Sequence, residues 1–275
     1  MKAYELAIAL ASSALGVNAA FAQMAPNSPA QDAIVVDPST IAPLISKNRA
    51  VDASKMEYRR IISSFNDDFK DIDVGLSNYN GGASFRGISY IGHDEICYID
   101  KGMFVSIVKG NNTVVRAGQV MFRPEGATSD GKTITKATSV CFFSPARPKE
   151  WAPPGKPDYD QDTPQPQFID PELSPSTEGD PALTEGSMTS YHAISRNIGA
   201  RRIGADIIFY SQGSMIVKRA HPTEEIWYVA EGAGAINCAG TDKPFREGQF
   251  IALRAGSRCD LRLTKDSKII AVHAL

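Results

Sequence analysis

The sequence lacks the features that mark nucleic-acid binding or a multi-span membrane protein. It has 29 Lys and Arg against 31 Asp and Glu, a net charge of −2, so it has no basic excess to attract a phosphate backbone. Beyond the amino terminus no apolar stretch is long enough to cross a bilayer. Its four cysteines do not follow the spacing of a zinc knuckle. We therefore expect no nucleic-acid partner and a small-molecule partner instead.

Residues 1–22 have the pattern of a cleavable export signal. Lys2 is followed by the short apolar segment 6–17 and by the small-x-small sequence Ala20-Phe21-Ala22. This segment is too short to span a bilayer comfortably. The sequence thus predicts a secreted or periplasmic protein with no membrane contact once the signal is removed. Residues 23–50 are expected to form an extended N-terminal arm.

The pairing of the cysteines cannot be read from the sequence. In an oxidising compartment Cys97 and Cys141 could form a disulfide. Buried free thiols are an equally good interpretation of Cys97, Cys141, Cys238 and Cys259. Both alternatives stay open at this point.

The chain contains an internal duplication with a constant offset of 130 residues. The matching residues are Glu95, Ile96, Tyr98, Gly102, Arg116, Gly118, Gln119, Gly126 and Asp130, which recur as Glu225, Ile226, Tyr228, Gly232, Arg246, Gly248, Gln249, Gly256 and Asp260. Each copy has short runs of β-branched and aromatic residues that end at glycines, which is typical of strands in a sandwich or barrel. The sequence therefore predicts an all-β protein with one barrel over 51–143 and another over 186–275.

A proline-rich linker over 144–185 separates the two copies. Residues 144–181 hold ten of the seventeen prolines, which excludes a continuous helix or a central strand. We expect this segment to be ordered across the junction of the barrels, with Trp151 and Phe168 buried against them. A flexible tether between independent barrels is the alternative.

Both copies resemble the cupin superfamily, whose RmlC-like barrels carry two motifs. The first motif is His-x-His, three or four residues, Glu, six residues and Gly; the second is Gly, five residues, Pro-x-Gly, two residues and His. The first copy matches the first motif through Glu95 and Gly102 and aligns with the second through Gly118, Pro124, Gly126 and Ser129. The second copy matches the first motif through His221, Glu225 and Gly232 and aligns with the second through Gly248, Arg254, Gly256 and Cys259. Segments 90–96 and 117–124 look most like the ethanolamine-utilisation type. The resemblance implies two tandem jelly-roll-like cupin barrels, and a homo-oligomer is compatible with it.

The resemblance also shows which metal-ligand positions have been lost. In the first copy the four positions hold Ser89, Ile91, Glu95 and Ser129, so we expect no metal there. His93 is out of register and is expected on the surface. In the second copy they hold Arg219, His221, Glu225 and Cys259. Arg219 beside Glu225 predicts a buried ion pair or a carboxylate-binding fork, and His273 could approach the same cavity.

The leading hypothesis is a lyase or isomerase without a cofactor, acting in the second barrel. His221 would move a proton, Glu225 would orient it, and Arg219 would stabilise an enolate or carboxylate, with Cys259 facing them. Trp227 in this barrel, and Glu95 and Cys97 in the first, are expected to line substrate pockets. Because Cys97 and Ile99 follow Glu95 at period two, the first cavity is predicted to be smaller and more apolar.

Two alternatives remain. A metal-dependent oxygenase or hydrolase would hold Fe, Mn or Zn through His221, Glu225 and Cys259. A non-catalytic binding or structural protein would explain why the first barrel has kept only Glu95 of its four ligand positions.

Overall fold

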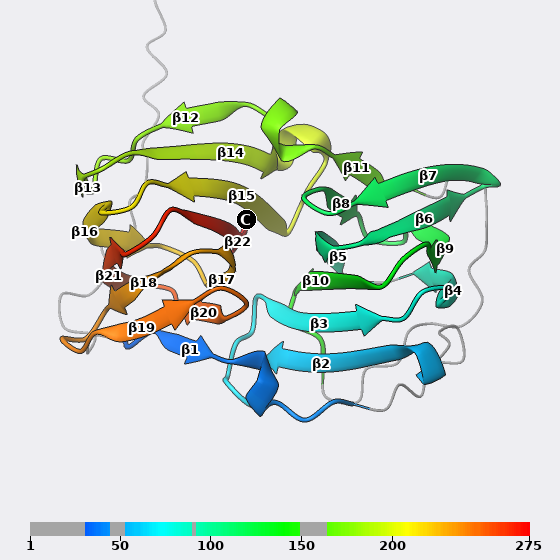
Figure 1. Cartoon of the computed structure of the whole chain (residues 1–275), viewed down its shortest axis with the longest axis horizontal. Coiled ribbons are helices and arrows are strands. Elements are labelled where there is room, and N and C mark those ends of the chain that lie inside the picture. Colours follow the sequence, from blue (N-terminus) through cyan, green and yellow to red (C-terminus); the bar gives the residue numbers. More distant parts are fainter. Residues whose placement is uncertain (1–30, 45–52, 90–91, 149–163) are drawn as a thin grey trace, which may run out of the picture.

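The computed structural model describes residues 31–44, 53–89, 92–148 and 164–275, and the regular structure of these residues is β-strand apart from four short 3-10 helices (Figure 1). The first barrel consists of β2 (Met56–Ile62), β3 (Asp73–Tyr79), β4 (Ser84–Ser89), β5 (Asp94–Lys101), β6 (Met103–Val108), β7 (Asn111–Arg116), β8 (Val120–Arg123), β9 (Thr128–Thr133) and β10 (Ala137–Ser144). The second consists of β14 (Met188–Ile194), β15 (Ile203–Tyr210), β16 (Met215–His221), β17 (Glu225–Glu231), β18 (Ala233–Asn237), β19 (Lys243–Arg246), β20 (Phe250–Leu253), β21 (Ser257–Leu263) and β22 (Ser267–Ala274).

Short elements connect and extend the barrels. They are the strands β1 (Ile34–Val36), β11 (Gln167–Ile169), β12 (Ser176–Glu178) and β13 (Leu183–Glu185), and the 3-10 helices η1 (Pro38–Thr40), η2 (Ala53–Lys55), η3 (Pro171–Leu173) and η4 (Arg196–Ile198). None of the described helices is long and apolar enough to cross a membrane.

Each barrel is made of two facing antiparallel sheets. In the first, the sheet β11-β8-β5-β10-β3-β2 faces β4-β9-β6-β7; in the second, β1-β20-β17-β22-β15-β14-β12 faces β13-β16-β21-β18-β19. The sheets face each other because their strands have one buried side. In β21, for example, the residues alternate strictly between buried and exposed, so the buried ones lie on one face of the strand. The predicted fold class is confirmed: the chain has two tandem, cupin-type jelly-roll barrels.

The glycine that ends each central strand is required by the turn that follows. Gly102 has φ +81° and Gly232 has φ +95°, a left-handed conformation that glycine adopts without steric cost. A Cβ atom at Gly102 would lie 2.1 Å from the carbonyl oxygen of Lys136. Any larger side chain would therefore push the neighbouring strand away.

The two large sheets pack against each other through an apolar layer that joins the barrels. It contains residues from both copies, including Ile96, Val140, Phe142, Ile226, Ile270 and Val272, all buried. Tyr98 and Tyr228, which are equivalent in the duplication, meet at a ring-centroid distance of 6.3 Å. The barrels therefore share one core, and about 25 cal/mol of stabilisation is expected per Å² of apolar surface that it buries.

The copies also exchange their first strands. β1 from the N-terminal arm pairs with β20 of the second barrel, and β11 from the linker pairs with β8 of the first. Each exchanged strand runs into an Asp-Pro pair, Asp37-Pro38 or Asp170-Pro171, that caps a 3-10 helix. These Asp-Pro pairs are offset by 133 residues rather than 130, so they were not part of the predicted duplication.

The linker follows the barrels over its described part. β11 joins the first barrel, and β12 and β13 pair with β14 and β16 of the second. Phe168 is half-buried against the first barrel, while Trp151 lies outside the described residues. Over residues 164–185 the linker thus adds strands to three of the four sheets and is not a free tether.

Two carboxylates hold the loops of one copy against the strands of the other. Glu224 accepts hydrogen bonds from the backbone N–H groups of Lys70 and Asp71, with distances down to 2.8 Å. Its equivalent Asp94 accepts from the N–H groups of Arg201 and Arg202 at 3.1 and 3.0 Å. We call these two contacts the carboxylate latches. Because each latch immediately precedes a motif glutamate, it fixes the start of the strand that carries that glutamate.

Candidate functional site

The second barrel brings His221 and Glu225 together at the junction of β16 and β17. His221 ends one strand and Glu225 begins the next, so a short turn places both side chains in the barrel. His221 Nδ1 lies 3.1 Å from Glu225 Oε1. Trp227, two residues along the same face, donates from Nε1 to Glu225 Oε2 at 2.9 Å. The carboxylate is thus held between an imidazole and an indole.

His221 is buried without a full set of hydrogen bonds. It is 1% exposed, and its Nε2 has no hydrogen-bond partner among the described residues. Its Nδ1 meets Glu225 at too oblique an angle for a well-formed hydrogen bond, so that contact is mainly electrostatic. The ring of Trp227 packs edge-on against it, with centroids 5.6 Å apart. Because an unsatisfied buried polar atom costs about 1–3 kcal/mol, Nε2 is the atom at which a ligand would be stabilised.

Glu225 is held in its charged form by its neighbours. Burial alone would raise the pKa of this carboxyl, but the contacts with His221 and Trp227 and the more distant charge of Arg219 outweigh burial and hold the pKa below its usual range. Glu225 is therefore a carboxylate near neutral pH.

The predicted ion pair between Arg219 and Glu225 does not form. Its Nη1 lies 3.7 Å from Asp180 Oδ2 and donates to the Tyr210 hydroxyl at 3.4 Å. Asp180 belongs to the linker, whose course could not be inferred from the motif. Burial raises the pKa of Tyr210 to about 12, so its hydroxyl stays neutral and accepts the bond. Arg219 acts on Glu225 only through its charge at longer range.

Cys259 is not a free thiol, and its predicted roles as a catalytic group and a metal ligand are wrong. It forms a disulfide with Cys238, which directly follows β18, with Cα atoms 4.1 Å apart. A disulfide sulfur has no thiolate to donate to a metal or a substrate. The second barrel therefore offers His221 and Glu225 but no third ligand from Cys259.

A metal ion does not fit the remaining residues of the second barrel. Three or more protein ligands are needed for the usual transition-metal site. Within the described residues, the one group of three candidate ligands whose atoms all lie within 4.8 Å of one another is Glu95, Cys97 and Cys141. That group belongs to the first barrel, and two of its members form a disulfide.

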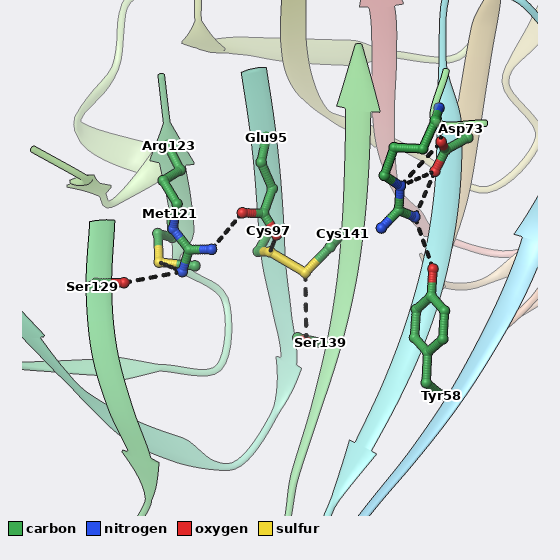
Figure 2. Close-up of a disulfide and its surroundings, with 10 residues drawn as sticks. Tyr58, Asp73, Glu95, Cys97, Met121, Arg123, Ser129, Ser139 and Cys141 are labelled. Carbon is green, nitrogen blue, oxygen red and sulfur yellow. Dashed lines mark hydrogen bonds and ion pairs between the residues drawn. A yellow bond between two sulfur atoms is a disulfide. The ribbon is translucent and has the colours of Figure 1, made fainter. Parts of the chain in front are cut away.

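In the first barrel an arginine occupies the interior beside the motif glutamate (Figure 2). Arg123 Nη1 contacts Glu95 Oε2 at 2.5 Å, and its Nη2 donates to Ser129 Oγ at 3.2 Å. Glu95 and Ser129 are two of the four motif positions, so a buried guanidinium bridges them. Arg123 was not among the predicted site residues, although antiparallel pairing of β5 with β8 places it directly opposite Glu95. The side chains of Ser89 and Ile91 lie outside the described residues.

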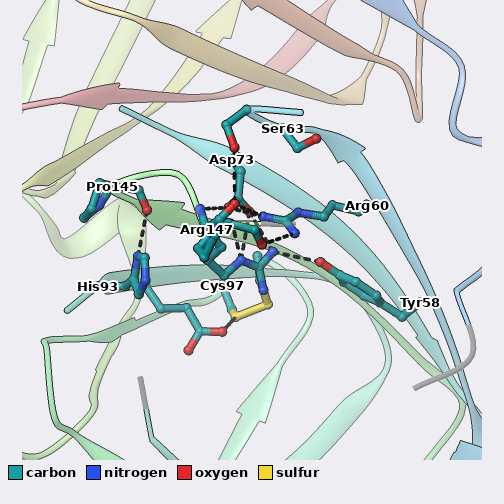
Figure 3. Close-up of polar contacts among 12 residues, drawn as sticks. Tyr58, Arg60, Ser63, Asp73, His93, Cys97, Pro145 and Arg147 are labelled. Atoms are coloured by element: carbon teal, nitrogen blue, oxygen red, sulfur yellow. Dashed lines mark hydrogen bonds and ion pairs between the residues drawn. A yellow bond between two sulfur atoms is a disulfide. The ribbon is translucent and has the colours of Figure 1, made fainter. Parts of the chain in front are cut away.

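The expectation of a more apolar first barrel is wrong. Asp73 on β3 accepts from Arg147 Nη2 at 2.6 Å and from Arg60 Nη2 at 3.0 Å, and Arg147 also donates to the Tyr58 hydroxyl (Figure 3). Arg147 comes from the start of the linker, which folds back over the barrel. Burial raises the pKa of Glu95 even though arginines lie close to it. Charged residues thus fill an interior that its strand sequences alone made look apolar.

His93 is also placed differently from the prediction. It is 9% exposed, and its Nδ1 lies 2.7 Å from the carbonyl oxygen of Pro145 (Figure 3). The predicted surface histidine is therefore a buried contact to the linker. His273 lies opposite Glu225 in the pairing of β17 with β22 and remains partly exposed.

Two hollows on the surface lie near the junction of the barrels. One of about 180 Å³ is lined by Gln119, Glu172 and Phe209, and one of about 290 Å³ by Thr189, Tyr210 and Glu231; Lys268 lines both. Neither is lined by His221 or Glu225. Trp227, predicted as a pocket residue, is 1% exposed and supports Glu225.

No family model matches the sequence, and no curated protein matches it. Solved structures do match in fold. A protein of Pseudomonas aeruginosa, assigned provisionally as glyoxylate-induced, is 13% identical with a TM-score of 0.71 over 92% of this chain and 93% of its own. The E. coli protein Ylba is 12% identical, with a TM-score of 0.64 over 89% and 91%. Bacillus subtilis oxalate decarboxylase is 13% identical, with a TM-score of 0.66 over 90% and 78%. At such low identity these similarities show the cupin-type double-barrel fold alone.

Proposed function

We propose that the chain is an exported bicupin whose second barrel catalyses a proton transfer on a small organic metabolite without a metal. The reaction classes are isomerisation, epimerisation, cyclisation and dehydration. The observation that carries the proposal is the buried imidazole of His221, with a carboxylate 3.1 Å from Nδ1 and no hydrogen-bond partner at Nε2 among the described residues.

The proposed roles follow from this geometry. Glu225 stabilises the protonated imidazole, so that Nε2 can take a proton from the substrate and return it. Trp227 holds the second oxygen of Glu225 and keeps the carboxylate in place. Arg219, whose side chain is 23% exposed, would exchange part of its contact with Asp180 for a carboxylate of the substrate. Cys259 has no role in this scheme.

Export is supported by chemistry beyond the predicted signal peptide. All four cysteines form disulfides, Cys97–Cys141 and Cys238–Cys259, and disulfides persist in oxidising compartments. We also propose that the first copy is of the ethanolamine-utilisation type, on the strength of its sequence motifs. The structural neighbours support only the broader cupin-type fold. The first barrel, whose interior holds charged pairs, would support the fold and not the reaction.

The proposal is tested by a thermal-shift screen of small organic acids and related metabolites, followed by a turnover assay on each compound that binds. His221→Leu should lose at least about 100-fold in turnover, since general acid–base catalysis contributes about 10²–10⁴-fold. His192→Gln is the matched control, because His192 also contacts a carboxylate, Asp206, at 2.8 Å but is exposed. Full activity of His221→Leu would refute the proposal.

The same variant has an expected effect on stability. Leucine removes the unsatisfied Nε2 of His221 but also takes the imidazole away from the buried carboxylate of Glu225. Because the two effects oppose each other, we expect the free energy of unfolding of His221→Leu to stay within about 1–2 kcal/mol of the wild type. Elemental analysis of protein purified without chelator tests the metal-dependent alternative. One equivalent of Fe, Mn or Zn that activity requires would establish that alternative in place of our proposal.

A further inference from the structure

Glu95, Cys97 and Cys141 form a compact cluster inside the first barrel. Candidate ligand atoms of the three residues all lie within 4.8 Å of one another. Cys97 and Cys141 face each other on the paired strands β5 and β10 and are joined by a disulfide. Figure 2 shows the carboxylate of Glu95 pointing at this sulfur pair. The two sulfur atoms cannot act as thiolate ligands while they form a disulfide. Reduction of the disulfide would provide both thiolates.

The two carboxylate oxygens of Glu95 have different neighbours. Glu95 Oε2 is taken by Arg123 at 2.5 Å, whereas Oε1 lies 3.2 Å from Cys97 Sγ. Oε1 is thus aimed at the position that a metal bound to the sulfurs would occupy. Arg123 also donates to Ser129, which fixes the guanidinium on the far side of the carboxylate.

The charges balance in both redox states. With the disulfide closed, Glu95 and Arg123 cancel. With the disulfide open and a divalent cation bound, two thiolates and one carboxylate carry three negative charges, which the cation and Arg123 neutralise. The neighbouring group of Asp73 with Arg147 and Arg60 carries one net positive charge in both redox states, so it does not change this balance. Since an uncompensated buried charge costs several kcal/mol, this neutrality favours a site for one divalent cation.

We propose that reduction of Cys97–Cys141 turns the first barrel into a binding site for a thiolate-preferring divalent cation of the zinc type, with Cys97, Cys141 and Glu95 as ligands. A dithiol reductant supplies two electrons and two protons, its own thiols form a disulfide, and the S–S bond opens to two thiols. Cation binding then releases those two protons. Zinc accepts sulfur and carboxylate ligands together, and this site is independent of the proposed chemistry of His221.

The full chain, reduced with dithiothreitol and freed of reductant without oxygen, should bind about one Co²⁺ with the absorption of a thiolate–cobalt complex. The oxidised chain should show no such absorption. Glu95→Gln should weaken binding by at least about tenfold, because even a changed outer contact has this effect on metal sites. Cys97→Ser/Cys141→Ser should abolish the signal, and Cys238→Ser/Cys259→Ser, the matched control, should keep it.

A second measurement uses the wild-type chain alone, in case a variant fails to fold. Zn²⁺ added to the reduced protein should protect Cys97 and Cys141 from alkylation and leave Cys238 and Cys259 reactive, as read by peptide mass spectrometry. Equal protection of all four cysteines, protection of none, or Co²⁺ absorption that persists in Cys97→Ser/Cys141→Ser would overturn the proposal.

Discussion

Arg123 in the first barrel and Leu253 in the second occupy the same place in the strand pairing, opposite Glu95 and Glu225 respectively. The arginine gives Glu95 a cation of its own, and the glutamate becomes part of the barrel's internal charge network. The leucine gives Glu225 nothing to pair with, so this carboxylate is left to His221 and Trp227. Together with Ile91 and Cys97, which stand where the second copy has His221 and Trp227, this difference separates a structural carboxylate from a candidate catalytic one.

Removing the internal cation should have the largest effect on stability. Arg123→Leu gives the first barrel the residue of the second and leaves Glu95 buried without its partner, so we expect a loss of about 3–5 kcal/mol in the free energy of unfolding. Adding Glu95→Leu should recover most of this loss. Urea unfolding measures both variants. Arg246→Leu, which breaks an exposed pair with Asp37, should cost under about 1 kcal/mol. A similar loss in the free energy of unfolding for Arg123→Leu and Arg246→Leu would show that the buried ion pair contributes no more to stability than the exposed one.

The two disulfides should differ modestly in their contribution. Cys97–Cys141 closes a loop of 44 residues and Cys238–Cys259 one of 21. Loop-closure entropy predicts about 4 kcal/mol for the first and about 3 kcal/mol for the second. Double serine variants of each pair, unfolded in urea under identical conditions, measure the difference. The reverse order would indicate that the polar interior of the first barrel, and not loop length, sets the cost.

The carboxylate latches should make similar contributions, because they are equivalent in the duplication. Glu224→Ala removes a charged acceptor from two backbone N–H groups, and Asp94→Ala removes one from three, since Asp94 also accepts from the N–H of Glu125 at 3.0 Å. We expect losses of about 1.5–3 kcal/mol for each variant. In addition, Glu224→Ala should reduce the turnover of a proposed second-barrel substrate, since it frees the start of β17. Equal turnover in the two variants would argue that only the fold depends on the latches.

The two motif glutamates should give opposite dependences on pH. The folded-state pKa of Glu225 lies below its unfolded value near 4.5, so its stabilising contribution is complete above that pH and is lost as pH falls through the folded pKa. The folded-state pKa of Glu95 is raised, so its contribution is complete below the unfolded pKa and is lost as pH rises through the folded pKa. Unfolding free energies of Glu225→Gln and Glu95→Gln relative to wild type, measured on both sides of pH 4.5, should slope in opposite directions.

Local sequence was sufficient for the fold and for half of the second-barrel site. The duplicated glycines and alternating strands predicted two barrels because strand periodicity and turn chemistry are local properties. The contact of His221 with Glu225 was predictable for the same reason, since one turn joins them.

The other site residues depended on which strands become neighbours. Four cysteines allow three pairings, and only the placement of β18 beside β21 decides that Cys259 meets Cys238. Arg123 and Asp180 reach the motif positions from another strand and from the linker, and strand β1 crosses to the second barrel. The sequence by itself determined two barrels, their turns and the His221–Glu225 contact. The tertiary structure decided which sulfur, which cation and which strand stands beside each glutamate, because register between distant segments is set by packing of the whole core.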